Sequence, residues 1–314
     1  MRSVFVVVRH ELALAIGVLA LLASGPVAAE VSITLTNIFI EKYENHATID
    51  AQFLVDHSKG KPNPAFKDGD MHVAGRDAKN IGMAAVAGIM NTTNHADAVD
   101  AANASVGTNS PIPVSGAWRI WNEGGDNAFI QCKPVAAAQT SNPDHSLEIH
   151  SISQINGINI ELSFQPTLGH GAKKPEDAFP RYDNVRSKFI PKPGKTTIVS
   201  NGIGYKYVNF QMALNERPFK IAAGALAMAR VQDMEGHLLL RTTRVVFVKA
   251  TAPEVAVRDL GAGAFLRVLG IPRLDLALVS WRVKNRKDER DPLNWTPSYE
   301  IIVVGMYPEK CEED

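Results

Sequence analysis

The segment from Val245 to Tyr307 constrains the fold of this chain more than any other part of its sequence. Apolar strand patterns alternate there with one short helical pattern and one charged stretch. In order, they are the strand Val245 to Val248, the helix Pro253 to Leu260, the strand Phe265 to Ile271, the charged stretch Lys284 to Asp291 and the strand Tyr299 to Met306. This succession is typical of the closing half of a small Greek-key barrel.

Apolar and polar residues also alternate along much of the remaining chain, as they do in half-buried strands. These strand patterns cover residues 31–40, 47–55, 70–75, 114–121, 147–152, 158–164, 205–214, 225–231 and 238–248. Residues 97–104 predict a short helix, and residues 82–90 fit either a strand or a helix. The pattern predicts a mainly β protein with two OB-like Greek-key barrels and short helices.

A stretch rich in proline and glycine, residues 166–193, divides the strand patterns into two groups. Such a composition is typical of a linker or an irregular loop between domains. We therefore expect a first OB-like domain at residues 30–165 and a second at residues 194–314. Two barrels joined in this way should be separable by mild proteolysis within the linker.

The composition is that of an ordinary globular protein, with 45% hydrophobic and 21% charged residues among 314. The formal net charge is zero. The chain therefore has no overall field that would attract nucleic acid or a membrane surface, and either partner would need a local patch.

The first 29 residues have the three-part pattern of a secretory signal peptide. Arg2 and Arg9 precede an apolar run from Leu12 to Leu22, and small residues at 27–29 supply a cleavage site before Glu30. The alternative is a membrane anchor, but the uninterrupted run is shorter than the ~20 apolar residues that span a bilayer. We expect export to the periplasm or the extracellular space, with no membrane span in the mature chain.

The chain contains two cysteines, Cys132 and Cys311. In an oxidising compartment an even number of cysteines favours pairing, so a Cys132–Cys311 disulfide is expected. The alternatives are two buried thiols, or one buried thiol and one in the exposed, charged C-terminal tail.

The second half resembles the bacterial single-stranded DNA-binding proteins. The resemblance lies in the strands 226–231 and 243–248, the helix after them, the segment 261–270 (GAGAFLRVLG) and the closing strand 299–303 (YEIIV). It implies an OB barrel that binds a strand of nucleic acid by stacking bases on aromatic side chains. The first half resembles uncharacterised exported proteins that carry an Asp-x-His strand and a later Glu-x-His strand, a similarity that implies no activity.

Acidic residues and histidines recur at a spacing of two in the first half. Asp68, Asp70 and His72 would share one face of an extended segment, and Glu148 and His150 would share one face of a later strand. Adjacent strands of this kind would bring together carboxylates and imidazoles that bind zinc or another divalent ion. The alternative is a polar seam without a metal. The candidate metal residues are Asp70, His72, Glu148 and His150.

The second half has cations and tryptophans on or beside the strands that an OB barrel presents to ligands. An alternative is that the charged stretch near residue 286 is only a solvated loop. The candidate ligand-binding residues are Arg244, Arg267, Trp281, Arg286, Lys287 and Trp295.

These features favour an exported, non-enzymatic binding module over an enzyme. The sequence has no P-loop, dinucleotide fingerprint, Gly-x-Ser-x-Gly or His-Glu-x-x-His motif, and we expect no cofactor. OB barrels bind oligosaccharides and nucleic acids, and one fold can serve many functions. We therefore expect the ligand to be an oligosaccharide, a peptide or a single-stranded nucleic acid. The alternative is a metal-dependent hydrolase that uses Asp70 with His72 and Glu148 with His150.

Overall fold

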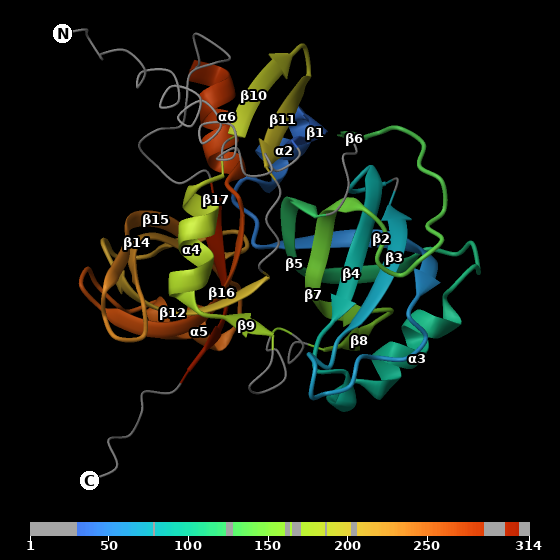
Figure 1. Cartoon of the computed structure of the whole chain (residues 1–314), viewed down its shortest axis with the longest axis horizontal. Coiled ribbons are helices and arrows are strands. Elements are labelled where there is room, and N and C mark those ends of the chain that lie inside the picture. The colour runs from blue at the N-terminus through green and yellow to red at the C-terminus, as the bar shows by residue number, and fades with distance from the viewer. Residues whose placement is uncertain are drawn as a thin grey trace, which may run out of the picture.

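The structure is a computed structural model, and it describes residues 30–77, 79–123, 128–160, 164, 171–185, 187–201, 206–285 and 299–307. Its strands form three sheets, two of which close into five-stranded barrels. The barrels lie side by side in Figure 1. The predicted fold, mainly β with two OB-like barrels and short helices, is confirmed. None of the described helices is long and apolar enough to cross a bilayer.

The first barrel consists of β2 (Thr48–Ser58), β3 (Met71–Asp77), β4 (Met83–Ile89), β5 (Ile112–Glu123) and β7 (His145–Ile155). The strands follow one another around the barrel as β2-β3-β4-β7-β5, and β5 pairs back onto β2. The pair β4–β7 is parallel. The one-turn helix η1 (Thr92–Asn94) and α3 (Ala96–Ala104) connect the third strand to the fourth, and β8 (Ile158–Asn159) folds back to pair antiparallel with the end of β7. This is the OB arrangement.

The second barrel repeats the same order with β12 (Tyr207–Leu214), β14 (Gly224–Gln232), β15 (Leu238–Val248), β16 (Phe265–Leu274) and β17 (Tyr299–Met306). Its third and fifth strands, β15 and β17, are again parallel, and β12 pairs with both β14 and β16 to close the barrel. Helix α5 (Ala252–Val257) again lies between the third and fourth strands. The short strands β13 (Phe219–Ile221) and β9 (Ala172–Lys173) pair with β14 and β12.

Helix α4 (Pro175–Asp183) packs against the interior of the second barrel. The Phe179 ring lies 5.4 Å from the Phe210 ring in an edge-on contact, and the Tyr182 ring lies 5.1 Å from the Tyr299 ring. These residues are all nearly inaccessible to solvent. The stretch 166–193 was expected to be a linker or an irregular loop, but its described part contains α4 and the strand β10 (Ser187–Lys192).

A third sheet connects the two halves of the chain. It has the order β10, β11 (Lys195–Asn201), β1 (Glu30–Thr36) and β6 (Ala128–Ile130). Strand β1 pairs with β11 along its whole length, so the start of the described chain is bound to a strand that lies beyond residue 194. Near this sheet, α2 (Asn37–Tyr43) packs against α6 (Leu276–Asn285).

Two helices differ from the sequence-based expectation. Residues 31–40 were predicted to form one strand, but the chain turns into α2 at Thr36, whose hydroxyl oxygen accepts a hydrogen bond from the Phe39 amide at 3.2 Å. The helix then buries Phe39, Ile40 and Tyr43 on one face. Helix α6 was not predicted, and its start is capped by Asp275, which accepts a hydrogen bond from the Leu278 amide at 2.9 Å.

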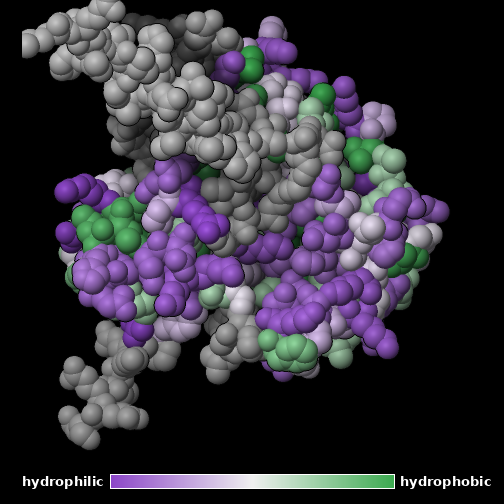
Figure 2. Space-filling view, in the orientation of Figure 1, coloured by the Kyte–Doolittle hydropathy of each residue, from purple (hydrophilic) through white to green (hydrophobic). Residues whose placement is uncertain are grey.

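The barrels share an apolar interface. One cluster of buried side chains draws members from both barrels: Ala47, Met90, Ala117, Phe164, Tyr207, Leu226, Val246, Val248, Leu269, Ile271, Ile302 and Val304. At its edge the Arg273 guanidinium lies 4.4 Å from the centroid of the Trp118 ring. By contrast, the face seen in Figure 2 is mainly hydrophilic, with apolar side chains gathered over β14 and β15 at its left edge.

Candidate functional site

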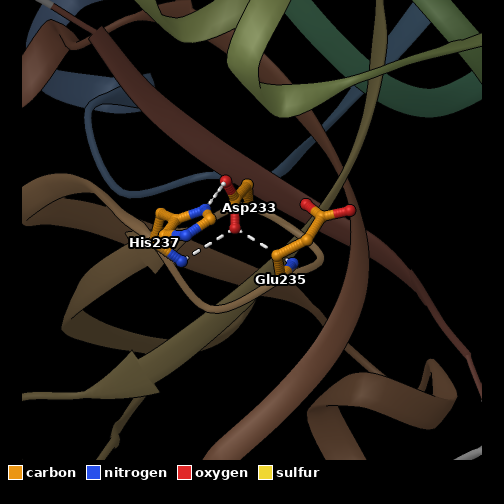
Figure 3. Close-up of side chains that lie close together, drawn as sticks. All are labelled: Asp233, Glu235 and His237. Atoms are coloured by element: carbon orange, nitrogen blue, oxygen red, sulfur yellow. Dashed lines mark hydrogen bonds and ion pairs between the residues drawn. The ribbon is translucent and has the colours of Figure 1, made fainter.

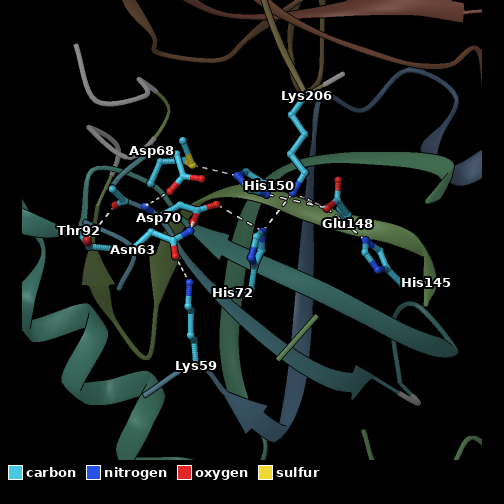
Figure 4. Close-up of polar contacts among 12 residues, drawn as sticks. Lys59, Asn63, Asp68, Asp70, His72, Thr92, His145, Glu148, His150 and Lys206 are labelled. Atoms are coloured by element: carbon cyan, nitrogen blue, oxygen red, sulfur yellow. Dashed lines mark hydrogen bonds and ion pairs between the residues drawn. The ribbon is translucent and has the colours of Figure 1, made fainter. Parts of the chain in front are cut away.

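A cluster of titratable side chains lies on the outer face of the first barrel (Figure 4). Strand β4 separates β3 from β7, and its Gly88 is paired in register with His72 on one side and His150 on the other. Because Gly88 has no side chain, the two rings meet above it with their centroids 5.6 Å apart. A Cβ at this position would lie 2.6 Å from His150 Nδ1.

Glu148 is the fully buried centre of this cluster. One carboxylate oxygen accepts a hydrogen bond from Arg119 Nε at 2.7 Å, and the other lies 3.1 Å from Lys206 Nζ and 3.2 Å from His145 Nε2. Burial alone would raise the pKa of Glu148, but Arg119 and Lys206 outweigh it and hold the pKa well below its usual range. The two cations therefore favour the ionised form of Glu148.

Lys206 enters this cluster from the segment that leads into the second barrel. Its ammonium donates a hydrogen bond to His72 Nε2 at 3.0 Å. Burial, and then the charge of Lys206, lowers the pKa of His72 to about 4, so the imidazole is neutral at neutral pH. The same two causes hold the pKa of His150 well below its usual value, and its Nε2 lies 2.9 Å from Met90 Sδ.

Asp70 lies at the edge of the cluster. It accepts a hydrogen bond from Asn63 Nδ2 at 2.7 Å, and its other oxygen is 3.4 Å from His72 Nε2. Burial, followed by the charge of Asp68, raises the pKa of Asp70 to about 6. The acidic and imidazole groups are thus close together, as the spacing of residues in the sequence suggested.

The geometry nevertheless favours an ion-pair network over a metal centre. The Lys206 ammonium lies within hydrogen-bonding distance of both His72 and Glu148, where a divalent ion would need to bind. An ammonium and a metal ion compete for the same lone pairs. The sequence did not suggest Lys206, because it lies in the second half and belongs to no motif. The metal site remains a hypothesis.

A second group of possible metal ligands, Asp233, Glu235 and His237, lies in the hairpin between β14 and β15 (Figure 3). The Asp233 carboxylate accepts hydrogen bonds from the amides of Glu235 and His237, at 3.0 and 2.8 Å, and approaches His237 Nδ1 at 2.8 Å. Its oxygens are therefore used by the turn itself, and the group stabilises the hairpin.

The predicted ligand-binding residues of the second barrel do not form one surface. Arg244 forms ion pairs with Glu300 and with Asp275, and it donates a hydrogen bond to the backbone oxygen of Glu44 at 3.1 Å. It therefore connects the second barrel to the end of α2, which precedes the first barrel. Arg267 is half-buried on β16, and Trp281 is 49% exposed on α6. The remaining candidates, Arg286, Lys287 and Trp295, lie outside the described residues.

The strand face of the second barrel that was expected to bind a ligand is covered. Leu226 on β14 is 4% exposed, and Val246 and Val248 on β15 are 0% and 3% exposed. All three belong to the interface cluster shared with the first barrel. A ligand cannot reach this part of the face unless the barrels separate.

A pocket of about 720 Å³ lies on the first barrel. It is lined by Gln52, Leu54, Arg76, Asp77, Lys79, Gly82, Met83, Asn109, Pro111, Cys132, Lys133, Pro134 and Val135. The segment that follows β6 forms one wall. Arg76 Nη1 donates to Val135 O at 3.3 Å, and the Ala138 amide donates to Asp56 at 3.2 Å, which hold this segment against the barrel.

Cys132 lines this pocket with an exposed side chain and has no disulfide partner among the described residues. Its expected partner, Cys311, lies outside the described residues. The Cys132–Cys311 disulfide therefore stays a prediction. No sequence pattern indicates the pocket, because its lining residues come from five separate segments and form no motif.

Comparisons with known proteins identify no family. No protein-family profile matches the chain, and no curated protein sequence matches it. A crystal structure of a deletion mutant of the single-stranded DNA-binding protein from Thermus aquaticus is similar over 85% of this chain and 96% of that one, with 11% identity and a TM-score of 0.20. A likeness of this size supports no argument about function, so the OB assignment rests on the strand order.

Proposed function

We propose that this protein is an exported, non-enzymatic binding protein whose ligand occupies the pocket on the first barrel. The observation that carries the proposal is the pocket itself, whose volume of about 720 Å³ falls within the roughly 300–1,000 Å³ of typical small-ligand sites. The lining combines apolar side chains with a few polar groups, as such sites do.

The position of the pocket supports the same function. OB barrels bind ligands on the face of their second and third strands and with the loops after the first and fourth strands. Here β3 and β4 are the second and third strands, and Arg76, Asp77 and Met83 on them line the pocket. Residues 132–135 belong to the connection between the fourth and fifth strands, β5 and β7.

The second barrel offers a weaker case. Its strand face is covered at Leu226 and Val246 by the first barrel, and Arg244 is engaged in ion pairs. A nucleic-acid ligand on this barrel would depend on Trp281 and on residues 286–298. Failure of an oligonucleotide to bind at low salt would exclude that alternative.

The alternative function is a metal-dependent hydrolase at Asp70, His72, Glu148 and His150. It is favoured by the gathering of these groups and disfavoured by Lys206 among them. Metal analysis of the purified protein separates the two functions. A stoichiometric divalent ion that is lost in the His72→Ala variant would favour the hydrolase, and its absence from the folded protein would favour the binding protein.

Cys132 provides a direct test of the pocket. In a Cys311→Ser background the rate of Cys132 alkylation by iodoacetamide, an uncharged reagent, reports access to the pocket. A panel of oligosaccharides, peptides, oligonucleotides and small amphiphiles should contain at least one class that slows this rate in a saturable way. A panel in which no class slows the rate would contradict the proposal.

A matched pair of variants controls for effects elsewhere. Val135 in the pocket wall and Val106 after α3 are similarly exposed, at 39% and 38%. Val135→Trp should fill the pocket and remove the protection, whereas Val106→Trp should leave it unchanged. Equal protection in both variants would place the ligand elsewhere.

The protein is expected to be exported. The apolar run from Leu12 to Leu22, followed by small residues at 27–29, has the pattern of a secretory signal peptide. N-terminal sequencing of the mature protein should give a chain that begins near Glu30. A mature cytoplasmic chain that retains Met1 would contradict export.

A further inference from the structure

We infer that the ligand of this pocket is a small amphiphilic anion, a single aliphatic chain with a carboxylate head group. The inference rests on the proposed function, because it names the chemistry of the molecule that the pocket would bind. Three properties of the lining support it: an apolar wall, two unpaired cations and the absence of an aromatic side chain among the described lining residues.

The wall of the pocket is largely aliphatic. Leu54 lies on the outer face of β2, Met83 begins β4, and Val135 faces them from the segment after β6. Pro111 and Pro134 add further apolar surface. Burial of an aliphatic chain against such groups is favourable in proportion to the apolar surface removed from water.

The charge at this pocket is positive once the internal pairs are accounted for. Lys79 and Lys133 are exposed, and neither forms an ion pair with any described residue. Arg76 is neutralised by Asp56, which it contacts at 2.6 Å. The two lysines are therefore free to attract an anionic head group.

Asp77 does not cancel these lysines. Its carboxylate is 1% exposed and accepts hydrogen bonds from the backbone amides of Gln52 at 2.6 Å, Lys79 at 2.6 Å and Asn80 at 2.8 Å. These bonds consume the lone pairs that a cationic ligand would need. An anion is therefore a better match for this site than a cation.

The lining argues against a stacked ligand. Proteins bind single-stranded nucleic acid largely by stacking its bases on aromatic side chains. None of the described lining residues is aromatic. A flexible aliphatic chain needs no such platform, and its carboxylate accepts hydrogen bonds from Lys79 or Lys133.

The test compares molecules that share a tail and differ in the head group. Decanoate, decyl phosphate and decanol are titrated below their micellar concentrations at pH 8, and protection of Cys132 from iodoacetamide is measured in the Cys311→Ser protein. Decanoate should protect at about ten-fold lower concentration than decanol, the product of two exposed ion pairs of about two- to five-fold each. Added salt should reduce this difference.

Variants assign the effect to the lysines. Lys79→Gln and Lys133→Gln should each weaken protection by decanoate about two- to five-fold and leave protection by decanol unchanged. Lys249→Gln, which changes an exposed lysine in the turn before α5, should have no effect. Leu54→Ser should weaken the protection given by decanoate and by decanol alike.

Each remaining outcome is decisive. Equal protection by decanoate and decanol would contradict the inferred role of the charge. Stronger protection by decyl phosphate than by decanoate would contradict the carboxylate and indicate a phosphate head group instead. If no amphiphile protects Cys132 but another class of the panel does, this inference fails and the proposed function stands. If nothing protects Cys132, both fail.

Discussion

Gly88 determines whether the buried cluster of the first barrel can form. It lies in register between His72 and His150, and both rings occupy the space above it. Any side chain at this position would meet the His150 ring, whose Nδ1 would be 2.6 Å from a Cβ. The strand and its neighbours cannot shift freely, because β4 is paired on both sides.

Gly88→Ala should therefore destabilise the protein. The added methyl group must displace the buried His150 ring, and overpacking of this kind typically costs about 1–3 kcal/mol. Urea denaturation measures the free energy of unfolding. Gly261→Ala is the control, since a Cβ there meets nothing within 4 Å, and a loss of the same size in both variants would contradict the explanation.

Glu148 neutralises the cations that surround it. Glu148→Gln leaves Arg119 and Lys206 buried or half-buried without their counter-charge, and removal of one partner of a buried pair costs about 3–5 kcal/mol. The loss is measured as a lower melting temperature and urea midpoint. Glu176→Gln, which breaks only an exposed contact to Lys174 at 3.9 Å, should cost less than about 1 kcal/mol. Equal stability of Glu148→Gln and wild type would show that the network is not needed.

The start of α6 is held by a carboxyl group with an unusual ionisation. Asp275 caps the helix through the Leu278 amide and lies 3.3 Å from Arg244 Nη1. Burial, followed by the charge of Glu300, raises the pKa of Asp275 to about 6 from 3.8. Because the folded-state pKa is raised, the contribution of this group to stability is complete below about pH 4 and is lost as the pH rises through 6.

Asp275→Asn should remove this pH dependence. The amide keeps an oxygen that can cap the helix but does not ionise, so the variant should gain stability relative to wild type by about 1–3 kcal/mol between pH 4 and pH 8. Urea midpoints at pH 4, 6 and 8 measure this difference. A difference that does not change with pH would contradict the raised pKa.

The strands of this protein were more predictable than its helices. The alternation of apolar and polar residues correctly predicted most of the barrel strands, because one side of each strand faces a barrel core. The same alternation misled at residues 31–40, where Ile38 and Ile40 extend the strand pattern although Thr36 caps a helix. Helix α4 was missed because Pro175 and Pro180 indicate a loop, yet Pro175 occupies the first turn, where proline is tolerated.

The candidate site was predictable only in part. The spacing of Asp70, His72, Glu148 and His150 correctly placed them on one face, but it could not reveal Lys206, which reaches them from the other half of the chain. Arg244 was selected as a cation on a ligand-binding strand, and its ion pair with Glu300 depends on a contact between β15 and β17. The pocket was not predictable, because only the closed barrel brings Lys79 and Lys133 together.

The two barrels form one packed unit through an apolar interface and a shared sheet. The interface cluster contains Val246 and Ile302 from the second barrel and Ala117 from the first, and β1 pairs with β11. The sequence predicted separable barrels on either side of residues 166–193. The shared core favours coupled unfolding instead, because separation would expose both apolar faces to water.

Unfolding should therefore be a single transition, with tryptophan fluorescence and far-ultraviolet circular dichroism coinciding in urea. Val246→Asp places a charge in the interface, where Val246 is 0% exposed, and should destabilise both barrels together. Val255→Asp changes a residue that is 51% exposed on α5 and should have little effect. Two separate transitions, only one of them moved by Val246→Asp, would show that the barrels are independent.

Hydrogen–deuterium exchange, measured with and without whichever ligand protects Cys132, tests whether the first barrel is the binding surface. Slower exchange is expected for the amides of residues 76, 77, 79, 82 and 83 and of residues 132, 133 and 135, which line the pocket, with little change in the second barrel. Protection confined to residues 276–285 and 299–306, with the pocket unchanged, would contradict it and transfer the binding surface to the second barrel.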